Sequence, residues 1–135
     1  MTNSTTGLIA KRTINSNTAQ PTLSVIVPVY NTRDYLAETL QSIASSAELD
    51  LEIIIVNHGS TDDSDHIIQD WMKSTKIETT YIVQSNQGLS LARMSGISNA
   101  RGRYLVFCDS DDLLDMDTVL QLAALMDERS TDLGI

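Results

Sequence analysis

The sequence has little cysteine, few basic residues and no long apolar run, and each shortage excludes a class of protein. One cysteine, Cys108, in 135 residues cannot form a disulfide framework within the chain, which favours a reducing compartment. The chain has 9 Lys and Arg against 18 Asp and Glu, a net charge of −9. Nucleic acid and anionic membrane surfaces are therefore not expected as general partners, because both require basic patches.

The apolar stretches are too short to cross a membrane. The longest, residues 23–30 and 51–56, fall well below the ~20 residues that a transmembrane helix needs. Residues 1–20 are rich in Thr, Ser and Asn and lack the apolar segment of a signal peptide. We expect them to form a disordered polar arm, followed by a folded part at residues 21–135. The expected location is the cytoplasm, either free or peripheral to the inner face of a membrane.

Several common catalytic and phosphate-binding motifs are also missing. The chain has no Gly-rich lysine loop of the Walker type and no GxGxxG, which are the two commonest phosphate cradles. A Ser-His-Asp hydrolase built on Ser60 and His58 is disfavoured because the chain has no GxSxG motif. With one Cys and two His, a structural zinc site is not expected.

From residue 21 onward, short β-branched apolar runs alternate with helical patterns. Strands of 4–8 residues separated by helices of 10–15 residues imply right-handed βαβ units. We therefore predict an α/β fold, with a mainly parallel, Rossmann-like sheet flanked by helices. The strands are expected at residues 23–27, 51–56, 80–83 and 103–108, with the start of a fifth at 131–135; the helices are expected to be capped by Asn31 or Thr32, Ser64, Gly88 and Asp115.

In such a sheet the loops that follow the strands share one edge. This brings together residues 28–31, 57–60, 84–90 and 109–112. Gly59 and Gly88 permit close backbone approach or positive φ. Tyr30 can stack on a planar base, and Arg93 can reach a phosphate. The plainer interpretations are that Tyr30 is ordinary packing, that Arg93 lies along its own helix and that His58 is a solvated loop residue.

An acidic cluster, Asp109-Ser110-Asp111-Asp112, directly follows the apolar run 104–108. Its carboxylates repel one another unless water or a cation offsets their charge. Mg²⁺ and Mn²⁺ prefer oxygen ligands, often carboxylates together with substrate phosphates, and ligands of open α/β sheets bind beyond the carboxyl ends of the strands. The alternative is a solvated acidic turn that caps the next helix. The residues by themselves leave both interpretations open.

Four segments, taken in order, resemble the signature of family-2 glycosyltransferases with the GT-A fold. They are residues 24–31 (SVIVPVYN), 55–62 (IVNHGSTD), 86–93 (NQGLSLAR) and 102–113 (GRYLVFCDSDDL). The resemblance implies transfer of a sugar from a nucleotide-sugar, commonly a UDP-sugar, to an acceptor hydroxyl with Mn²⁺ or Mg²⁺. The chain would be the N-terminal, nucleotide-sugar-binding portion of such a domain.

The resemblance also implies roles for individual residues. Asp109 and Asp111 would be the DXD pair, with Asp111 the direct metal ligand and Asp109 nearer the ribose. Pro28 and Tyr30 would line the base, residues 57–60 would contact base and ribose, and Arg93 would lie beside the nucleotide. The full set of nucleotide-binding residues expected is Pro28, Tyr30, Asn31, His58, Gly59, Ser60, Gly88, Arg93, Asp109 and Ser110.

The chain departs from the family pattern in two ways. His58 stands where the family usually has Asp, a position expected to accept a hydrogen bond from the base. A neutral imidazole can accept one and a protonated imidazole cannot, so we predict weaker or pH-sensitive nucleotide binding. In inverting members the catalytic base lies downstream of the DXD region, and this chain ends at Ile135. We therefore expect a truncated chain that holds no acceptor machinery and is inactive alone.

Two other functions compete with a working donor site. One is a catalytically silent nucleotide-binding or interaction domain of the same fold, which the His58 departure and the short chain favour. The other is a phosphotransfer receiver domain. That class needs a lysine near the acidic cluster late in the chain, and no lysine follows Lys76.

Overall fold

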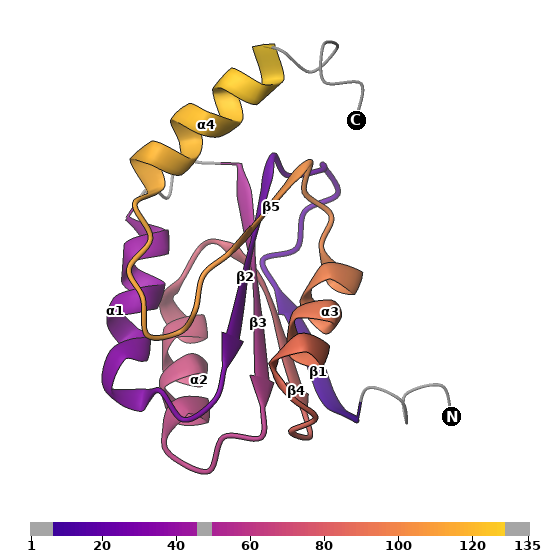
Figure 1. Ribbon diagram of the computed structural model, residues 1–135, viewed down its shortest axis with the longest axis vertical. Helices are drawn as coiled ribbons and strands as arrows, with labels where there is room; N and C mark the ends of the chain where they lie inside the picture. Colours follow the sequence, from indigo (N-terminus) through magenta and orange to yellow (C-terminus); the bar gives the residue numbers. More distant parts are fainter. Residues whose placement is uncertain (1–6, 46–49, 129–135) are drawn as a thin grey trace.

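The computed structural model describes residues 7–45 and 50–128, which form a five-stranded sheet with helices on both faces (Figure 1). The strand order is β1-β4-β3-β2-β5. The α/β, mainly parallel arrangement predicted from the sequence is confirmed. The strands are β1 (Leu8–Ile14), β2 (Leu23–Val29), β3 (Leu51–His58), β4 (Glu78–Gln84) and β5 (Tyr104–Phe107); the helices are α1 (Arg33–Ala44), α2 (Ser64–Ser74), α3 (Leu89–Asn99) and α4 (Met116–Glu128).

The strand order reverses at β2. This strand pairs in parallel with β3 on one side and with β5 on the other, while β3 pairs in parallel with β4. The chain leaves β2 through α1 on one face of the sheet and reaches β5 through α3 on the other face (Figure 1). The chain thus switches direction at β2, and the crevice beyond the carboxyl ends of the strands at such a switch point is where open α/β sheets bind ligands.

Each face of the sheet has its own apolar core. Val25, Val27 and Ile55 pack with α1 and α2, and Leu36, Leu40, Ile43 and Ile68 of these helices are fully buried. The opposite face packs Ile26, Ile54 and Val56 against Ala92 of α3. A Cβ at Gly96 of α3 would collide with the Ile26 side chain, so this glycine lets α3 lie directly on the strands.

The expectation of a disordered arm over residues 1–20 is wrong for the described part. Residues 8–14 form β1, an edge strand that runs antiparallel to β4. Its side chains are mostly exposed, so the strand lacks the apolar pattern that reveals buried strands in a sequence. Backbone pairing with β4 and a contact of 3.0 Å between the hydroxyls of Thr13 and Thr80 hold it in place. Residues 1–6 lie outside the described residues, as does the strand expected at 131–135.

Some element boundaries also differ from expectation. Asn57 and His58, expected in a loop, are the last residues of β3. Ser64 is the first residue of α2, and Asp63 occupies the N-cap position. Asp115 does cap α4, because its carboxylate accepts hydrogen bonds from the amide and the hydroxyl of Thr118 at 3.3 and 2.9 Å. No helix within residues 7–45 or 50–128 combines the length and the apolar character needed to cross a membrane.

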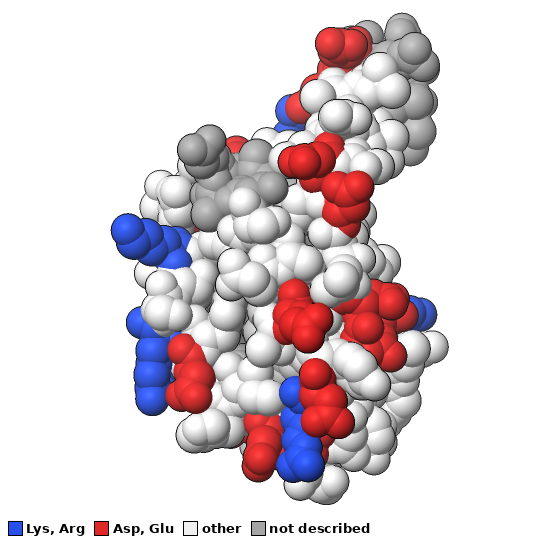
Figure 2. All heavy atoms as spheres, turned by 90° about the vertical axis from the view of Figure 1, so that its left-hand side faces the viewer, with Lys and Arg blue, Asp and Glu red and all other residues white. Residues whose placement is uncertain are grey.

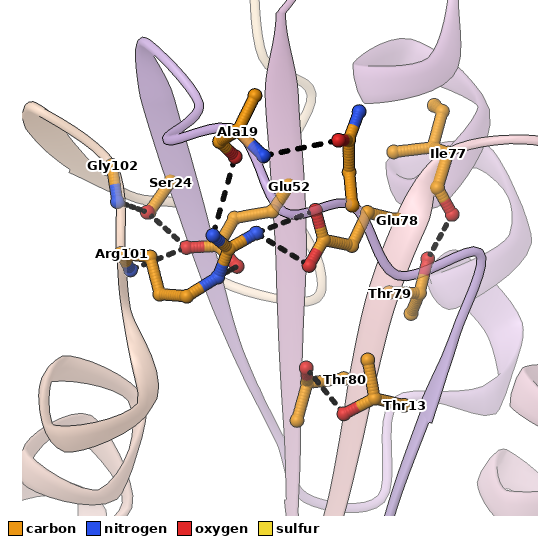
Figure 3. A network of polar contacts seen from close by, with 11 residues as sticks. Thr13, Ala19, Ser24, Glu52, Ile77, Glu78, Thr79, Thr80, Arg101 and Gly102 are labelled. Atoms are coloured by element: carbon orange, nitrogen blue, oxygen red, sulfur yellow. Dashed lines mark hydrogen bonds and ion pairs between the residues drawn. The ribbon is translucent and has the colours of Figure 1, made fainter.

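A buried polar network joins the strands at their amino ends (Figure 3). Glu52, whose side chain is 2% exposed, accepts hydrogen bonds of 2.6 Å from the Ser24 hydroxyl and from the Arg101 amide. The Arg101 guanidinium contacts both carboxylate oxygens of Glu78 at 2.7 and 2.6 Å and the Ala19 carbonyl at 3.2 Å. The network therefore ties β2, β3 and β4 to the segment that enters β5, at the edge of the sheet opposite the polar loops.

Candidate functional site

The predicted convergence of the polar loops is confirmed at the carboxyl edge of the sheet. The Asn31 amide donates to the Ser60 hydroxyl at 3.0 Å, which joins the loops after β2 and β3. The Thr32 hydroxyl donates to the Ser110 hydroxyl at 2.6 Å, which joins the loops after β2 and β5. Together with an ion pair between Arg93 and Asp109, these contacts place all the segments around the switch point.

Tyr30 and His58 form a ring pair at this edge. Their ring centroids lie 5.5 Å apart with an interplanar angle of 30°. Tyr30 is 43% exposed, whereas His58 is only 6% exposed. The interpretation of His58 as a solvated residue is therefore wrong. Burial lowers the pKa of His58 below 6.5, and a hydrogen bond with the Asn86 side chain opposes this shift, so the imidazole is neutral at pH 7.

Two asparagines shape the loop that follows β3. Asn31 adopts a left-handed conformation with φ of 51°, and its side-chain oxygen accepts hydrogen bonds from the amides of Thr61 and Asp62 at 2.8 and 3.2 Å. The Asn57 oxygen accepts from the Ser60 amide at 3.1 Å, and its amide nitrogen donates to the Tyr81 hydroxyl at 3.0 Å. The sequence placed Asn57 at this edge but missed its partner Tyr81, because a strand otherwise rich in apolar residues gives no sign of a polar contact across the sheet.

The predicted glycines have the backbone conformations that only glycine adopts easily. Gly59 has φ of 94° and Gly88 has φ of 97°, both in the left-handed region. A Cβ on Gly59 would come within 2.9 Å of the Asn86 Cβ, so this glycine also allows the loops after β3 and β4 to touch. Gly88 is the N-cap residue of α3. Pro28 lies buried within β2.

Arg93 extends from α3 across to β5 instead of lying along its own helix. Its guanidinium is 5.8 Å from the centre of the Phe107 ring, and Nη2 lies 3.4 Å from Oδ1 of Asp109. Both charged side chains remain partly exposed, at 40% and 48%. A cation is thus fixed beside the acidic cluster, where it can also meet an anion.

The carboxylates of the acidic cluster point toward a common space. Ligand oxygens of Asp109, Asp111 and Asp112 all lie within 4.8 Å of one another. Their proximity and burial of the thiol raise the pKa of the neighbouring Cys108 to about 11, with burial the larger cause. Asp115 caps α4, so the interpretation of the cluster as the cap of this helix is wrong. An all-oxygen set of carboxylates suits Mg²⁺ or Mn²⁺, so the residues fit the metal that the fold implies.

Ser110 differs from the acidic residues around it, since it is only 4% exposed. Its hydroxyl and its carbonyl oxygen both accept hydrogen bonds from threonines of the α1 region. The acidic residues therefore face outward, while the serine between them faces the protein interior.

Unsatisfied polar atoms collect at the same edge. Among residues 7–45 and 50–128, the buried side-chain nitrogens without a hydrogen-bond partner are His58 Nδ1, Gln84 Nε2 and Arg93 Nε. His58 and Gln84 are register partners at the ends of β3 and β4, and the Gln84 oxygen accepts from the Ser95 hydroxyl at 2.7 Å. Buried polar groups usually have partners, so their concentration here is typical of a ligand site. Gln84 was expected in the polar loop 84–90 at this edge but not among the nucleotide-binding residues, and it is the last residue of β4.

On the face shown in Figure 2, which carries α1 and α4, acidic side chains predominate over basic ones. An exposed acidic surface of this kind disfavours contact with polyanions. It is compatible with a site that draws in divalent cations.

The residues and their geometry match an established family. The family model for Glycosyl transferase family 2 matches residues 24–134. The chain belongs to glycosyltransferase family 2. Among curated relatives of this family-2 domain, glycosyltransferase GlyA of Streptococcus pneumoniae is 40% identical over 113 residues, which are 84% of this chain and 16% of GlyA. The chain thus spans well under two thirds of the length of this relative.

Solved structures share the fold of the family-2 domain. The structure of S. aureus TarS 1–349 in complex with UDP aligns with a TM-score of 0.71 and 31% identity, over 80% of this chain and 32% of TarS 1–349. The mannosyltransferase PcManGT from Pyrobaculum calidifontis, in complex with GDP-Man and Mn²⁺, aligns with a TM-score of 0.65 and 27% identity, over 71% of this chain and 29% of PcManGT. The domain therefore has the GT-A fold of nucleotide-sugar glycosyltransferases.

Proposed function

We propose that this chain binds a nucleoside-diphosphate sugar, a UDP-sugar, through a divalent ion, for glycosyl transfer to an acceptor hydroxyl. The observation that carries the proposal is the carboxylate cluster at the switch point, at the same edge of the sheet as the partly exposed Tyr30 of the Tyr30–His58 ring pair. The carboxylates suit a metal ion that binds the diphosphate, and the aromatic ring suits stacking on the base. The donor-binding unit would extend over residues 21–135, with β1 completing its sheet.

The base and ribose would occupy the side of the site formed by the loops after β2 and β3. Tyr30 offers a partly exposed ring for stacking, and Pro28 supports it from within β2. His58 presents a neutral imidazole to the base. Asn31, Gly59 and Ser60 form the adjoining wall, where close backbone approach is possible because Gly59 has no side chain.

The diphosphate would lie between the acidic cluster and the start of α3. Asp111, with Asp109, would hold Mn²⁺ or Mg²⁺, which acts as a Lewis acid and stabilises the negative charge that develops on the departing diphosphate. Arg93 supplies a further positive charge beside Asp109. Gly88, at the amino end of α3, keeps the approach to the helix amides clear of a side chain, and such amides favour anions.

The choice of UDP rests on the structural relatives. TarS 1–349 has been solved with UDP and with UDP-GlcNAc. PcManGT, which binds GDP-Man with Mn²⁺, aligns with lower identity and over less of this chain. The relatives therefore favour uridine over guanosine as the base, and a comparison of the affinities for UDP and GDP tests this choice.

A second candidate function is a nucleotide-binding domain without turnover. His58 at the base position favours it. Such a domain would bind UDP and the metal but would not hydrolyse or transfer the sugar of a UDP-sugar. Release of UDP from UDP-GlcNAc in the presence of Mn²⁺ separates the two functions.

Calorimetric titration with UDP, with and without Mn²⁺, tests the site itself. We expect binding that requires Mn²⁺ and that weakens at least about tenfold in Asp111→Ala, the loss expected when a metal ligand or its support is removed. Asp117→Ala is the matched control, because it removes an acidic side chain from the first turn of α4, outside the cluster. Binding that is indifferent to Mn²⁺ and to Asp111→Ala would refute the proposed site.

A further inference from the structure

The acidic cluster lies in a loop that the sheet itself does not hold. The hydrogen bond from the Cys108 amide to the Ile26 carbonyl, at 2.9 Å, is the last one that joins this segment to β2. Beyond it, the backbone makes one turn, in which the Asp112 amide donates to the Asp109 carbonyl at 3.0 Å. A turn of this kind fixes local curvature but not the position of the loop relative to the rest of the site.

Two threonines of the α1 region hold Ser110, at the centre of this loop, while Arg93 pairs with Asp109 and the Leu114 amide donates to the Ser42 hydroxyl at 3.1 Å on either side of it. The buried Thr39 hydroxyl donates to the Ser110 carbonyl oxygen at 2.9 Å, and the Thr32 hydroxyl donates to the Ser110 hydroxyl at 2.6 Å. Thr39 also lies 3.2 Å from the Tyr35 carbonyl, but a hydroxyl has one hydrogen and the contact with Ser110 is the shorter. Thr32 and Thr39 are seven residues apart in sequence, two helical turns, and so face the same way.

The bond from Thr39 acts on Asp111 through the peptide plane. The Ser110 carbonyl and the Asp111 amide belong to one rigid, planar peptide unit. A hydrogen bond that fixes the carbonyl therefore fixes the position of the Asp111 Cα. The turn bond from the Asp112 amide to the Asp109 carbonyl restricts rotation of the backbone at Asp111, so the two bonds together set the direction of the Asp111 side chain. The support is itself rigid, because Thr39 is fully buried between Leu36 and Leu40, which are also fully buried in the core.

We propose that Thr39, assisted by Thr32, is a positioning residue for the divalent cation: it holds the Ser110–Asp111 peptide so that the Asp111 carboxylate faces the diphosphate. This inference rests on the proposed function, since it assumes that Asp111 is a metal ligand. It assigns Ser110 an anchoring part instead of direct contact with the nucleotide. Thr39 does not touch the ion, and its effect is on affinity through the geometry of Asp111.

The test is Thr39→Val, which removes the hydroxyl and keeps nearly the same shape. The readouts are the Mn²⁺ affinity measured by electron paramagnetic resonance and the UDP affinity measured by calorimetry, with and without Mn²⁺. Loss of a group that supports a metal ligand costs roughly 10–100-fold in metal affinity, and we expect Mn²⁺ affinity to fall about tenfold or more. Thr39→Ser keeps the hydroxyl and should bind Mn²⁺ like the unaltered chain.

Thr79→Val is the matched control for loss of a buried threonine. Thr79 of β4 is fully buried and donates to the Ile77 carbonyl at 3.0 Å, so the variant loses the same type of bond at the amino end of the strand, away from the site. It should reduce thermal stability without changing Mn²⁺ affinity. Thr32→Val, at a partly exposed position, provides a second variant if Thr39→Val does not fold, and its Mn²⁺ affinity should fall by a smaller factor.

The outcomes separate this inference from the proposed function. If the unaltered chain binds UDP independently of Mn²⁺, the proposed function fails and the inference fails with it. A second outcome is that the unaltered chain requires Mn²⁺ to bind UDP while Thr39→Val and Thr32→Val both bind Mn²⁺ as tightly as the unaltered chain does. In that case only the positioning role is refuted. A loss in Thr79→Val as large as that in Thr39→Val would also refute it, because the effect would then follow from stability alone.

Discussion

Replacing Glu52 by alanine removes the centre of the buried network at the amino ends of the strands (Figure 3). The Ser24 hydroxyl and the Arg101 amide, each 2.6 Å from the carboxylate, would lose their acceptor. Arg101 would keep its two contacts with Glu78. The variant therefore leaves buried donors unsatisfied while the guanidinium itself stays paired.

The size of the effect follows from these contacts. A buried polar group left without a partner costs about 1–3 kcal/mol, and Glu52→Ala leaves two donors without their acceptor. Arg101 Nε also lies 3.9 Å from the Glu52 carboxylate, but the Arg101 side chain is 39% exposed and keeps Glu78, so this pair adds little. We therefore expect the free energy of unfolding of Glu52→Ala to fall by about 3 kcal/mol. In Glu52→Gln one oxygen still accepts both hydrogen bonds without the charge, so a fall of about 1–2 kcal/mol is expected.

Urea unfolding followed by circular dichroism measures these changes. Asp70→Ala is the matched control, because its carboxylate pairs with Lys73 at 3.6 Å but is 56% exposed, and exposed pairs contribute about 0–1 kcal/mol. The expected order of loss is Glu52→Ala, then Glu52→Gln, then Asp70→Ala. If Glu52→Ala lost no more than Asp70→Ala, the network would not stabilise the fold and the reasoning from burial would be refuted.

The remaining predictions concern His58 and Cys108. Burial holds the pKa of His58 in the folded chain below 6.5, so the unfolded chain takes up the proton first as pH falls. The free energy of unfolding of the unaltered chain should therefore decrease below about pH 6.5 relative to that of His58→Asn. Urea titrations that give the same pH dependence for both chains would contradict this. UDP affinity should weaken from about pH 8 to 5.5 in the unaltered chain and stay level in His58→Asp, and calorimetry showing the same pH profile for both would count against His58 as the base-reading residue. Since burial and the nearby carboxylates raise the pKa of Cys108 to about 11, a thiol reagent at about pH 8 should modify it only as fast as the chain unfolds, and rapid labelling of the folded chain would show that the thiol is accessible.

The strands and helices could be predicted well where burial is complete. β3 is buried at every position, so its almost continuous apolar run was visible in the sequence, and the start of α3 after Gly88 was expected. β1 was missed because its side chains are mostly exposed, and an edge strand with exposed side chains has no apolar pattern. Its stability comes from pairing with β4, a partner about 70 positions away in the chain.

The candidate site was predictable as a set of motifs but not as an arrangement of contacts. Tyr30, Gly59, Arg93 and the acidic cluster were expected from their places at the ends of strands and helices. Asn57 and Gln84 were expected at this edge as loop residues, but their contacts with Tyr81 and Ser95 were not. Thr39 was not expected at all, because a threonine inside a helix is unremarkable. Thr39 and Ser110 are separated by 71 positions, and no local pattern links them.

The sequence by itself determined the alternation of strands and helices from residue 21 onward, the family and the loops that carry polar chemistry, because periodicity and motifs are properties of neighbouring residues. The tertiary structure decided which face of each loop is available. It turned Ser110 inward and the aspartates outward, buried His58 in a neutral form, and set Arg93 against Asp109. These outcomes depend on desolvation and on contacts between distant segments, which arise only when the sheet brings its strands side by side.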